Sequence, residues 1–87
     1  MNNLKNIKIA FIDIDGTLAN DNNEITEYTK NTIRNAVSKG IYMIICSGRT
    51  NHYTVERSKM ASASNIVISD NGALIYDYNN DNKIWES

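Results

Sequence analysis

Apolar residues follow two different spacings along the chain, and these predict strands and helices in alternation. Residues 7–14 are a short, almost continuous apolar run rich in β-branched residues, as in a central strand buried on both faces of a parallel sheet. Residues 41–46 predict a second buried strand. Between these runs, apolar residues recur every three or four positions, which predicts a helix. Thr26 is its expected N-cap and Gly40 its expected stop.

The second half of the chain continues the pattern and then changes it. Residues 51–61 predict a helix with poor apolar spacing, and residues 65–69 predict a third strand. After a turn at residues 70–72, strands at 73–78 and 83–85 flank a polar turn, so we expect a hairpin over residues 73–87. The predicted fold class is α/β: a Rossmann-like core of parallel strands with right-handed crossover helices, ending in a β-hairpin.

Length and composition narrow the class of protein. The chain has 87 residues, of which 41% are hydrophobic and 22% charged, which fits one small globular domain. The net charge of −1 argues against a nucleic-acid surface, and no apolar run approaches the ~20 residues of a membrane helix. A single Cys excludes a disulfide framework or a multi-Cys zinc site. We expect a cytoplasmic protein that binds neither nucleic acid nor membrane.

Polar residues follow the first two strands directly. Asp13-Ile14-Asp15-Gly16-Thr17 comes after the first, and Ser47-Gly48-Arg49 after the second. In parallel sheets, ligands bind beyond the carboxyl ends of the strands, so both segments should meet at one edge. Asp-Gly or Ser-Gly after a strand is often only a turn, but the two motifs together in this context favour a functional site.

The first segment has the chemistry of a phosphate site. Asp13 and Asp15 should point the same way, and two adjacent carboxylates need a cation such as Mg²⁺. One carboxylate could then attack a phosphate to give an aspartyl-phosphate, while the other protonates the leaving oxygen. Gly16 allows backbone N–H groups to face the phosphoryl oxygens, and the Thr17 hydroxyl can orient a carboxylate or contact phosphate.

The second segment adds anion-binding groups where a helix should begin. Ser47 offers a hydroxyl, and Gly48 offers a closely approachable backbone N–H. Arg49 can pair with a phosphate, or with a carboxylate or hydroxyl of the substrate.

These motifs resemble those of a known family. Residues 13–18 resemble the first motif of the haloacid dehalogenase (HAD) superfamily of phosphohydrolases, and residues 45–49 are similar to its second motif. Residues 69–73, Ser-Asp-Asn-Gly-Ala, are similar to the Asn-Gly-Ala segment of the Cof-type subfamily. The resemblance covers the chain from about residue 7 to residue 85.

The resemblance implies a role for each matching residue. Asp13 would be the nucleophile and a Mg²⁺ ligand, and Asp15 would be the general acid/base and offer its backbone carbonyl to Mg²⁺. Thr17 would support Asp15. Gly16 and Ser47 would bind the phosphoryl group, with Gly48 and Arg49 beside it. Asn71 and Gly72 would lie on the substrate side.

The chain also departs from the family pattern. The resemblance implies a larger core and a cap domain. It also implies a Lys at the phosphoryl site and a later acidic motif that binds the metal. Here the lysines after the second motif are Lys59 and Lys83, in a predicted helix and hairpin, and no acidic motif follows. We therefore expect residues 1–87 to be one partial core domain, without the cap and the C-terminal part of the core.

Two functions remain open, with a third less well supported. The first is a Mg²⁺-dependent phosphatase acting on small phosphorylated metabolites such as sugar phosphates, here as a truncated chain. The alternative is a catalytically silent chain that binds Mg²⁺ or phosphate, or that needs a partner chain; its unpaired strand edge invites self-association. A phospho-accepting signalling domain also places an Asp at a strand end, but the Asp-x-Asp-Gly-Thr pattern fits it poorly.

Overall fold

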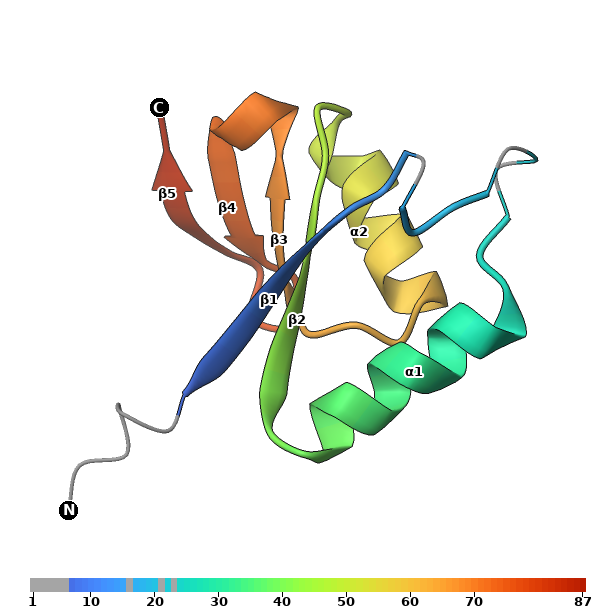
Figure 1. The fold of residues 1–87 in the computed structure, drawn as a ribbon. Helices are drawn as coiled ribbons and strands as arrows, with labels where there is room; N and C mark the ends of the chain where they lie inside the picture. Colours follow the sequence, from blue (N-terminus) through green and yellow to red (C-terminus); the bar gives the residue numbers. More distant parts are fainter. Residues whose placement is uncertain (1–6, 16, 21, 23) are drawn as a thin grey trace, which may run out of the picture.

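A five-stranded sheet and two α-helices form the fold of the described residues (Figure 1). The computed structural model describes residues 7–15, 17–20, 22 and 24–87. The order of elements is the predicted one, with the hairpin at the end of the chain. The elements are β1 (Lys8–Asp13), α1 (Glu27–Ser38), β2 (Ile41–Cys46), α2 (Asn51–Met60), β3 (Ile66–Ser69), the 3-10 turn η2 (Asp70–Gly72), β4 (Leu74–Asp77) and β5 (Asn82–Glu86).

The strands lie in the sheet in their chain order. β1, β2 and β3 pair in parallel, whereas β4 and β5 add as antiparallel strands. The register places Asp13 beside Cys46, the last residues of β1 and β2. The segments that follow these strands therefore leave the sheet at the same edge, as predicted.

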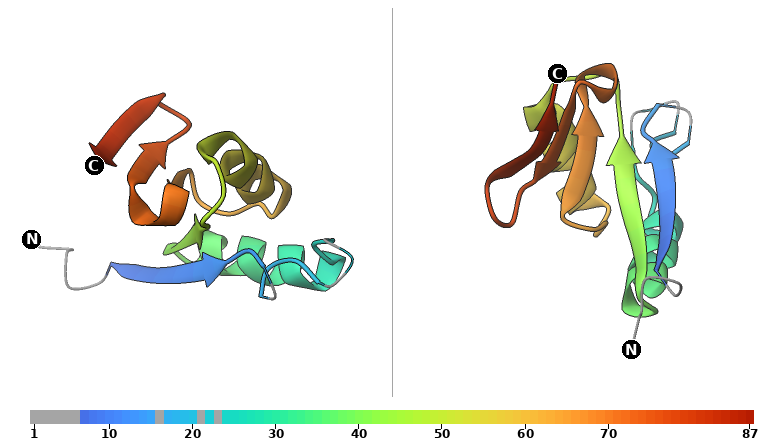
Figure 2. Two further views of the ribbon diagram at one scale, coloured as in Figure 1. Left: turned by 90° about the horizontal axis from the view of Figure 1, so that it is seen from above. Right: turned by 90° about the vertical axis from the view of Figure 1, so that its left-hand side faces the viewer.

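Both helices cover the same face of the sheet (Figure 2). The two crossovers step in the same direction along the sheet, and crossovers of one hand then place their helices on one side. Ile45 and Val67 are fully buried in the core on this side, together with Ile33 of α1. The opposite face of the sheet carries no helix of the described chain.

The prediction that residues 7–14 form a strand buried on both faces is wrong. β1 lies at the edge of the sheet, and no described strand pairs with its outer side. Ile9 is 51% exposed and Phe11 63% exposed. These side chains lie on the helix-free face, so nothing in the described chain covers them.

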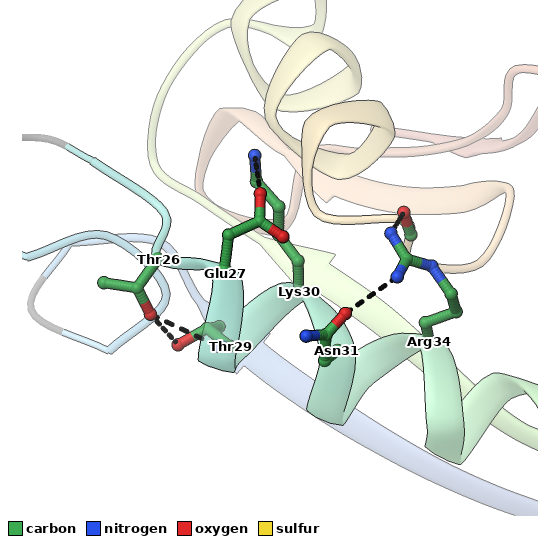
Figure 3. A network of polar contacts seen from close by, with 7 residues as sticks. Thr26, Glu27, Thr29, Lys30, Asn31 and Arg34 are labelled. Atoms are coloured by element: carbon green, nitrogen blue, oxygen red, sulfur yellow. Dashed lines mark hydrogen bonds and ion pairs between the residues drawn. The ribbon is translucent and has the colours of Figure 1, made fainter.

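α1 begins and ends at the predicted residues. The Thr26 Oγ1 accepts a hydrogen bond from the backbone N–H of Thr29 at 3.2 Å, which caps the first turn (Figure 3). An ion pair between Glu27 and Lys30, 3.7 Å, lies on the same turn. Gly40, at φ +86°, takes the left-handed conformation that lets the chain leave the helix.

The inner face of α2 is polar, which explains its poor apolar spacing. Thr54 and Ser58 are fully buried on this helix. The Thr54 hydroxyl donates to the Thr50 carbonyl at 2.8 Å, and the Ser58 hydroxyl donates to the Ser64 carbonyl at 3.1 Å. Their polar atoms are thus satisfied inside the protein, so small hydroxyl side chains can replace apolar ones at the contact.

The turn between β4 and β5 is organised by the Asp77 carboxylate. It accepts hydrogen bonds from the side-chain amides of Asn80 and Asn65, both at 2.7 Å, and from the backbone N–H of Asn79 at 3.0 Å. The bond from Asn80, followed by that from Asn65, holds the pKa of Asp77 below its usual value.

We expect Asp77→Asn to lower the urea midpoint of unfolding at pH 7, because the amide cannot accept these bonds as the carboxylate does. A lowered pKa in the folded state stabilises the protein above about pH 4, and this contribution is lost as the pH falls through the lowered value. The difference between the two proteins should therefore shrink below about pH 4. Glu56→Gln, on the exposed side of α2, is the control. A difference that stays constant with pH would contradict the assignment.

Candidate functional site

The segment after β1 is anchored by buried apolar residues. Ile14 is fully buried and Leu18 almost so. The backbone N–H of Leu18 donates to the Asp13 carbonyl at 3.0 Å, and that of Ala19 donates to the Ile14 carbonyl at 2.9 Å. The chain therefore turns tightly at the end of the strand, with its apolar side chains directed into the core.

The predicted residues of this segment that the structure describes are exposed beside those anchors. Asp13, Asp15 and Thr17 are accessible to solvent. Thr17 lines a mostly apolar cavity of about 240 Å³ beside Ile33 of α1. Gly16, predicted to bind phosphate, lies outside the described residues.

Ser47 begins the segment after β2. It is buried, and its backbone N–H donates to the Ile68 carbonyl at 2.9 Å. Its Oγ accepts a hydrogen bond from the backbone N–H of Arg49 at 2.9 Å. The hydroxyl oxygen is thus fixed in place, while its hydrogen can be donated to an anion.

The η2 turn packs onto this segment. The backbone N–H of Asp70 donates to the Arg49 carbonyl at 2.9 Å, and that of Asn71 donates to the Ser47 carbonyl at 3.3 Å. Asp70 and Asn71 both adopt left-handed backbone conformations, at φ 52° and 57°. A Cβ built on Gly48 would lie 2.5 Å from the Asn71 Oδ1, so a side chain at this position would require the Asn71 amide to shift. Gly72, also predicted on the substrate side, lies in the same turn.

An ion pair joins the β1 and β2 segments. The Arg49 Nη2 lies 3.3 Å from the Asp15 Oδ1, and both side chains are about half exposed. The structure therefore brings together Asp15, Arg49, Gly48 and Asn71, three separate segments of the sequence, at one edge of the sheet.

Asp13 and Asp15 could offer hard oxygen ligands to Mg²⁺ at this edge. Mg²⁺ is usually bound by one or two carboxylates together with water and phosphate oxygens. No cluster of three or more His, Cys, Asp or Glu side chains suited to a metal occurs in the described ranges. Burial, and secondly the Asp13 carboxylate, raise the pKa of the Cys46 thiol, which disfavours the metal-binding thiolate.

A larger cavity, of about 470 Å³, lies at the opposite end of the strands. Its lining includes Ile41, the first residue of β2, and the polar residues Ser64 and Tyr78. The Tyr78 hydroxyl already donates to the Ser64 carbonyl at 3.0 Å. We therefore interpret this cavity as a structural feature, remote from the carboxylates.

A stack of side chains that was not predicted from the sequence lies beside the site. The guanidinium carbons of Arg49 and Arg57 lie 4.8 and 4.7 Å from the centroid of the Tyr53 ring. Tyr53 and Arg57 are four positions apart on α2, a spacing that places side chains on one face of a helix, whereas Arg49 precedes the helix and its place on the ring has no such signal.

Comparison with known proteins places the chain in a family. A family model described as haloacid dehalogenase-like hydrolase matches residues 10–87. The chain is 40% identical over 73 residues to the 5-amino-6-(5-phospho-D-ribitylamino)uracil phosphatase YcsE of Bacillus subtilis (strain 168). That match covers 84% of this chain but 29% of the relative, so the chain spans less than a third of the relative's length.

Solved structures show the same fold. A haloacid dehalogenase-like hydrolase from Bacteroides thetaiotaomicron superposes with a TM-score of 0.84 at 25% identity, covering 92% of this chain and 31% of that one. The HAD subclass IIB sugar phosphatase BT4131 superposes with a TM-score of 0.77 at 26% identity, again over 92% of this chain and 31% of that one.

We expect Gly48→Ala to lower the free energy of unfolding by about 1 kcal/mol, because its Cβ would displace the Asn71 side-chain amide. Urea denaturation measures the change. The double variant Gly48→Ala/Asn71→Gly removes the colliding amide and should regain most of the loss. If the double variant is as unstable as the sum of the two single variants, the contact is not the cause.

Proposed function

The chain belongs to the haloacid dehalogenase-like hydrolase family, and we propose that it carries the nucleophile and phosphate-binding part of a Mg²⁺-dependent phosphatase. One observation carries this proposal: the segments after β1, β2 and β3 converge at a single edge, where Asp15 contacts Arg49 and Asn71 packs on Gly48. The relative YcsE is a phosphatase, which supports the same reaction class.

Asp13 and Asp15 divide the chemistry between them in this proposal. Asp13 attacks phosphorus; as its oxygen–phosphorus bond forms, the ester bond breaks and the leaving oxygen takes a proton from Asp15. Asp15 then takes a proton from the water that hydrolyses the aspartyl-phosphate. The Asp13 carboxylate and the Asp15 backbone carbonyl would hold Mg²⁺, which would neutralise charge around the phosphoryl group.

The phosphoryl group itself would lie at the N-terminus of α2. Ser47 donates its hydroxyl hydrogen, and Gly48 and Arg49 add a backbone N–H and a positive charge beside it. Gly16 and Thr17 would bind from the β1 side, and Asn71 and Gly72 would face the remainder of the substrate.

We propose that the substrate is a small phosphorylated metabolite, such as a sugar phosphate, in the cytoplasm. The structural neighbour BT4131 is a sugar phosphatase, which supports this substrate class. Across the part of the chain that the structure describes, no helix has the length and apolar character needed to cross a membrane.

A second candidate function is a chain that binds Mg²⁺ or phosphate but hydrolyses nothing until a partner chain completes the site. It is favoured by the open apolar face around Phe11 and by the small donor set of Asp13 and Asp15. In this case residues 1–87 form a partial core domain, whose hairpin over residues 73–87 leads toward a cap.

If the first candidate is right, the chain hydrolyses a phosphomonoester in the presence of Mg²⁺, and chelation by EDTA abolishes turnover. Asp13→Asn should then lower the rate by more than about a thousandfold, because the amide is no nucleophile. Release of inorganic phosphate measures the rate, with Glu56→Gln as the control. Equal turnover in the wild type and in Asp13→Asn would overturn the role of Asp13.

The second candidate predicts negligible turnover by the isolated chain and an association that light scattering can detect. Each chain has a mass of 9.8 kDa, so a self-associated form appears at a multiple of that value. A monomer with high phosphatase turnover would reject the need for a partner.

A further inference from the structure

We propose that Arg49 is a positioning residue for Asp15: its guanidinium, held on the Tyr53 ring, fixes the carboxyl group that acts as the acid. This inference rests on the proposed phosphatase function and adds to it. Arg49 would then hold the Asp15 carboxyl group in position, in addition to lying beside the phosphoryl group.

The backbone of Arg49 is fixed by its neighbours. Its N–H donates to the Ser47 Oγ at 2.9 Å, and its carbonyl accepts from the backbone N–H of Asp70, also at 2.9 Å. The next residue, Thr50, is the N-cap of α2. The base of the Arg49 side chain is thus held by β2, η2 and the start of a helix.

The Arg49 side chain is held by stacking. Its guanidinium carbon lies 4.8 Å from the centroid of the Tyr53 ring, where a cation is attracted by the π-electrons. Arg57 stacks on the same ring at 4.7 Å, and its buried Nε has no hydrogen-bond partner in the described chain. The Arg57 Nη1 donates to the Met60 Sδ at 3.6 Å, so Arg57 is held on α2 by this contact and by the ring.

Asp15 is an exposed loop residue that such a support could hold in place. It lies on the loop after β1, its side chain is 60% exposed, and Arg49 contacts it across 34 positions of sequence. An exposed ion pair contributes little to the stability of a fold. We therefore infer that the value of this pair lies in the orientation of the carboxyl group.

The chemistry of the acid makes this role measurable. When the Asp13 oxygen bonds to phosphorus, the electron pair of the broken ester bond passes to the leaving oxygen, which takes the proton of Asp15. An alkoxide leaving group needs that proton, whereas a good aryloxide leaving group needs it far less. Loss of positioning should consequently be felt most with alkyl phosphates.

NMR of the Arg49 guanidinium in the full chain tests the pairing without any turnover. Hindered rotation about its C–N bonds should give separate Nη signals in the wild type. These should merge in Asp15→Asn, and in Tyr53→Leu if the stack supports the pair. Free rotation of the wild-type guanidinium would overturn the proposal whether or not the chain hydrolyses phosphate.

Kinetics then separate positioning from simple phosphate binding. We expect Arg49→Met to lower kcat/KM for an alkyl phosphate on the order of tenfold more than for a nitrophenyl phosphate. Arg49→Lys, which keeps the charge, should lie between Arg49→Met and the wild type. Arg34→Met, an arginine on α1 that bonds to Asn31 at 2.8 Å, is the matched control. Equal losses on both substrates would assign Arg49 to the phosphoryl group alone.

Failure of the proposed function would look different. If nitrophenyl phosphate is hydrolysed no faster by the wild type than by Asp13→Asn, the phosphatase assignment fails, while the NMR result still decides whether Arg49 holds Asp15. If hydrolysis depends on Asp13 but the Arg49 variants show no leaving-group dependence, the positioning role fails alone.

Discussion

Parallel pairing of β1 with β2 sets Asp13 beside Cys46, and every later feature of the site depends on that register. Because both strands end at the same edge, the two polar segments leave the sheet together. A slip by one residue would exchange the faces of β1, sending Ile14 outward and its neighbouring carboxylates inward. The burial of Ile14 and Leu18 therefore secures the register and the exposure of Asp13 and Asp15 together.

The third segment reaches the site through an uncommon backbone conformation. Two successive non-glycine residues, Asp70 and Asn71, have positive φ angles, which Asp and Asn tolerate better than most residues. The turn they make lays the Asn71 amide on Gly48, so β3 and β2 share one rigid junction. Conformational cost at Asp70 and Asn71 is thus balanced by hydrogen bonds to the Arg49 and Ser47 carbonyls.

Much of this arrangement could be predicted from the sequence, since local patterns determine it. The spacing of apolar residues gave the order of the elements, and the Thr26 cap and the Gly40 stop mark α1 correctly. The one-sided cover of β1 could not be predicted, because a run such as residues 7–14 reads the same whether or not a second layer packs against it. The burial of a strand depends on which residues pack against its two faces, and the apolar run alone does not show this.

The site was predicted only in part for a similar reason. Residue types and strand ends indicate Asp13, Asp15 and Ser47, whereas the Arg49–Asp15 pair depends on where two loops meet. The contact of Asn71 with Gly48 likewise joins residues whose sequence spacing has no helical or strand period. Tyr53 and Arg57 share a helical spacing on α2, but Arg49 precedes the helix, so this spacing alone does not predict that both guanidinium groups stack on the Tyr53 ring.

The helix-free face has a consequence for how the protein behaves as temperature changes. Phe11 and Ile9 stand in water on a strand whose outer edge pairs with no described strand. The gain from removing apolar surface from water is largely entropic near 25 °C and weakens on cooling. Warming therefore strengthens the tendency of this face to adhere to other apolar surfaces before it melts the sheet, and the chain is best handled cold and dilute.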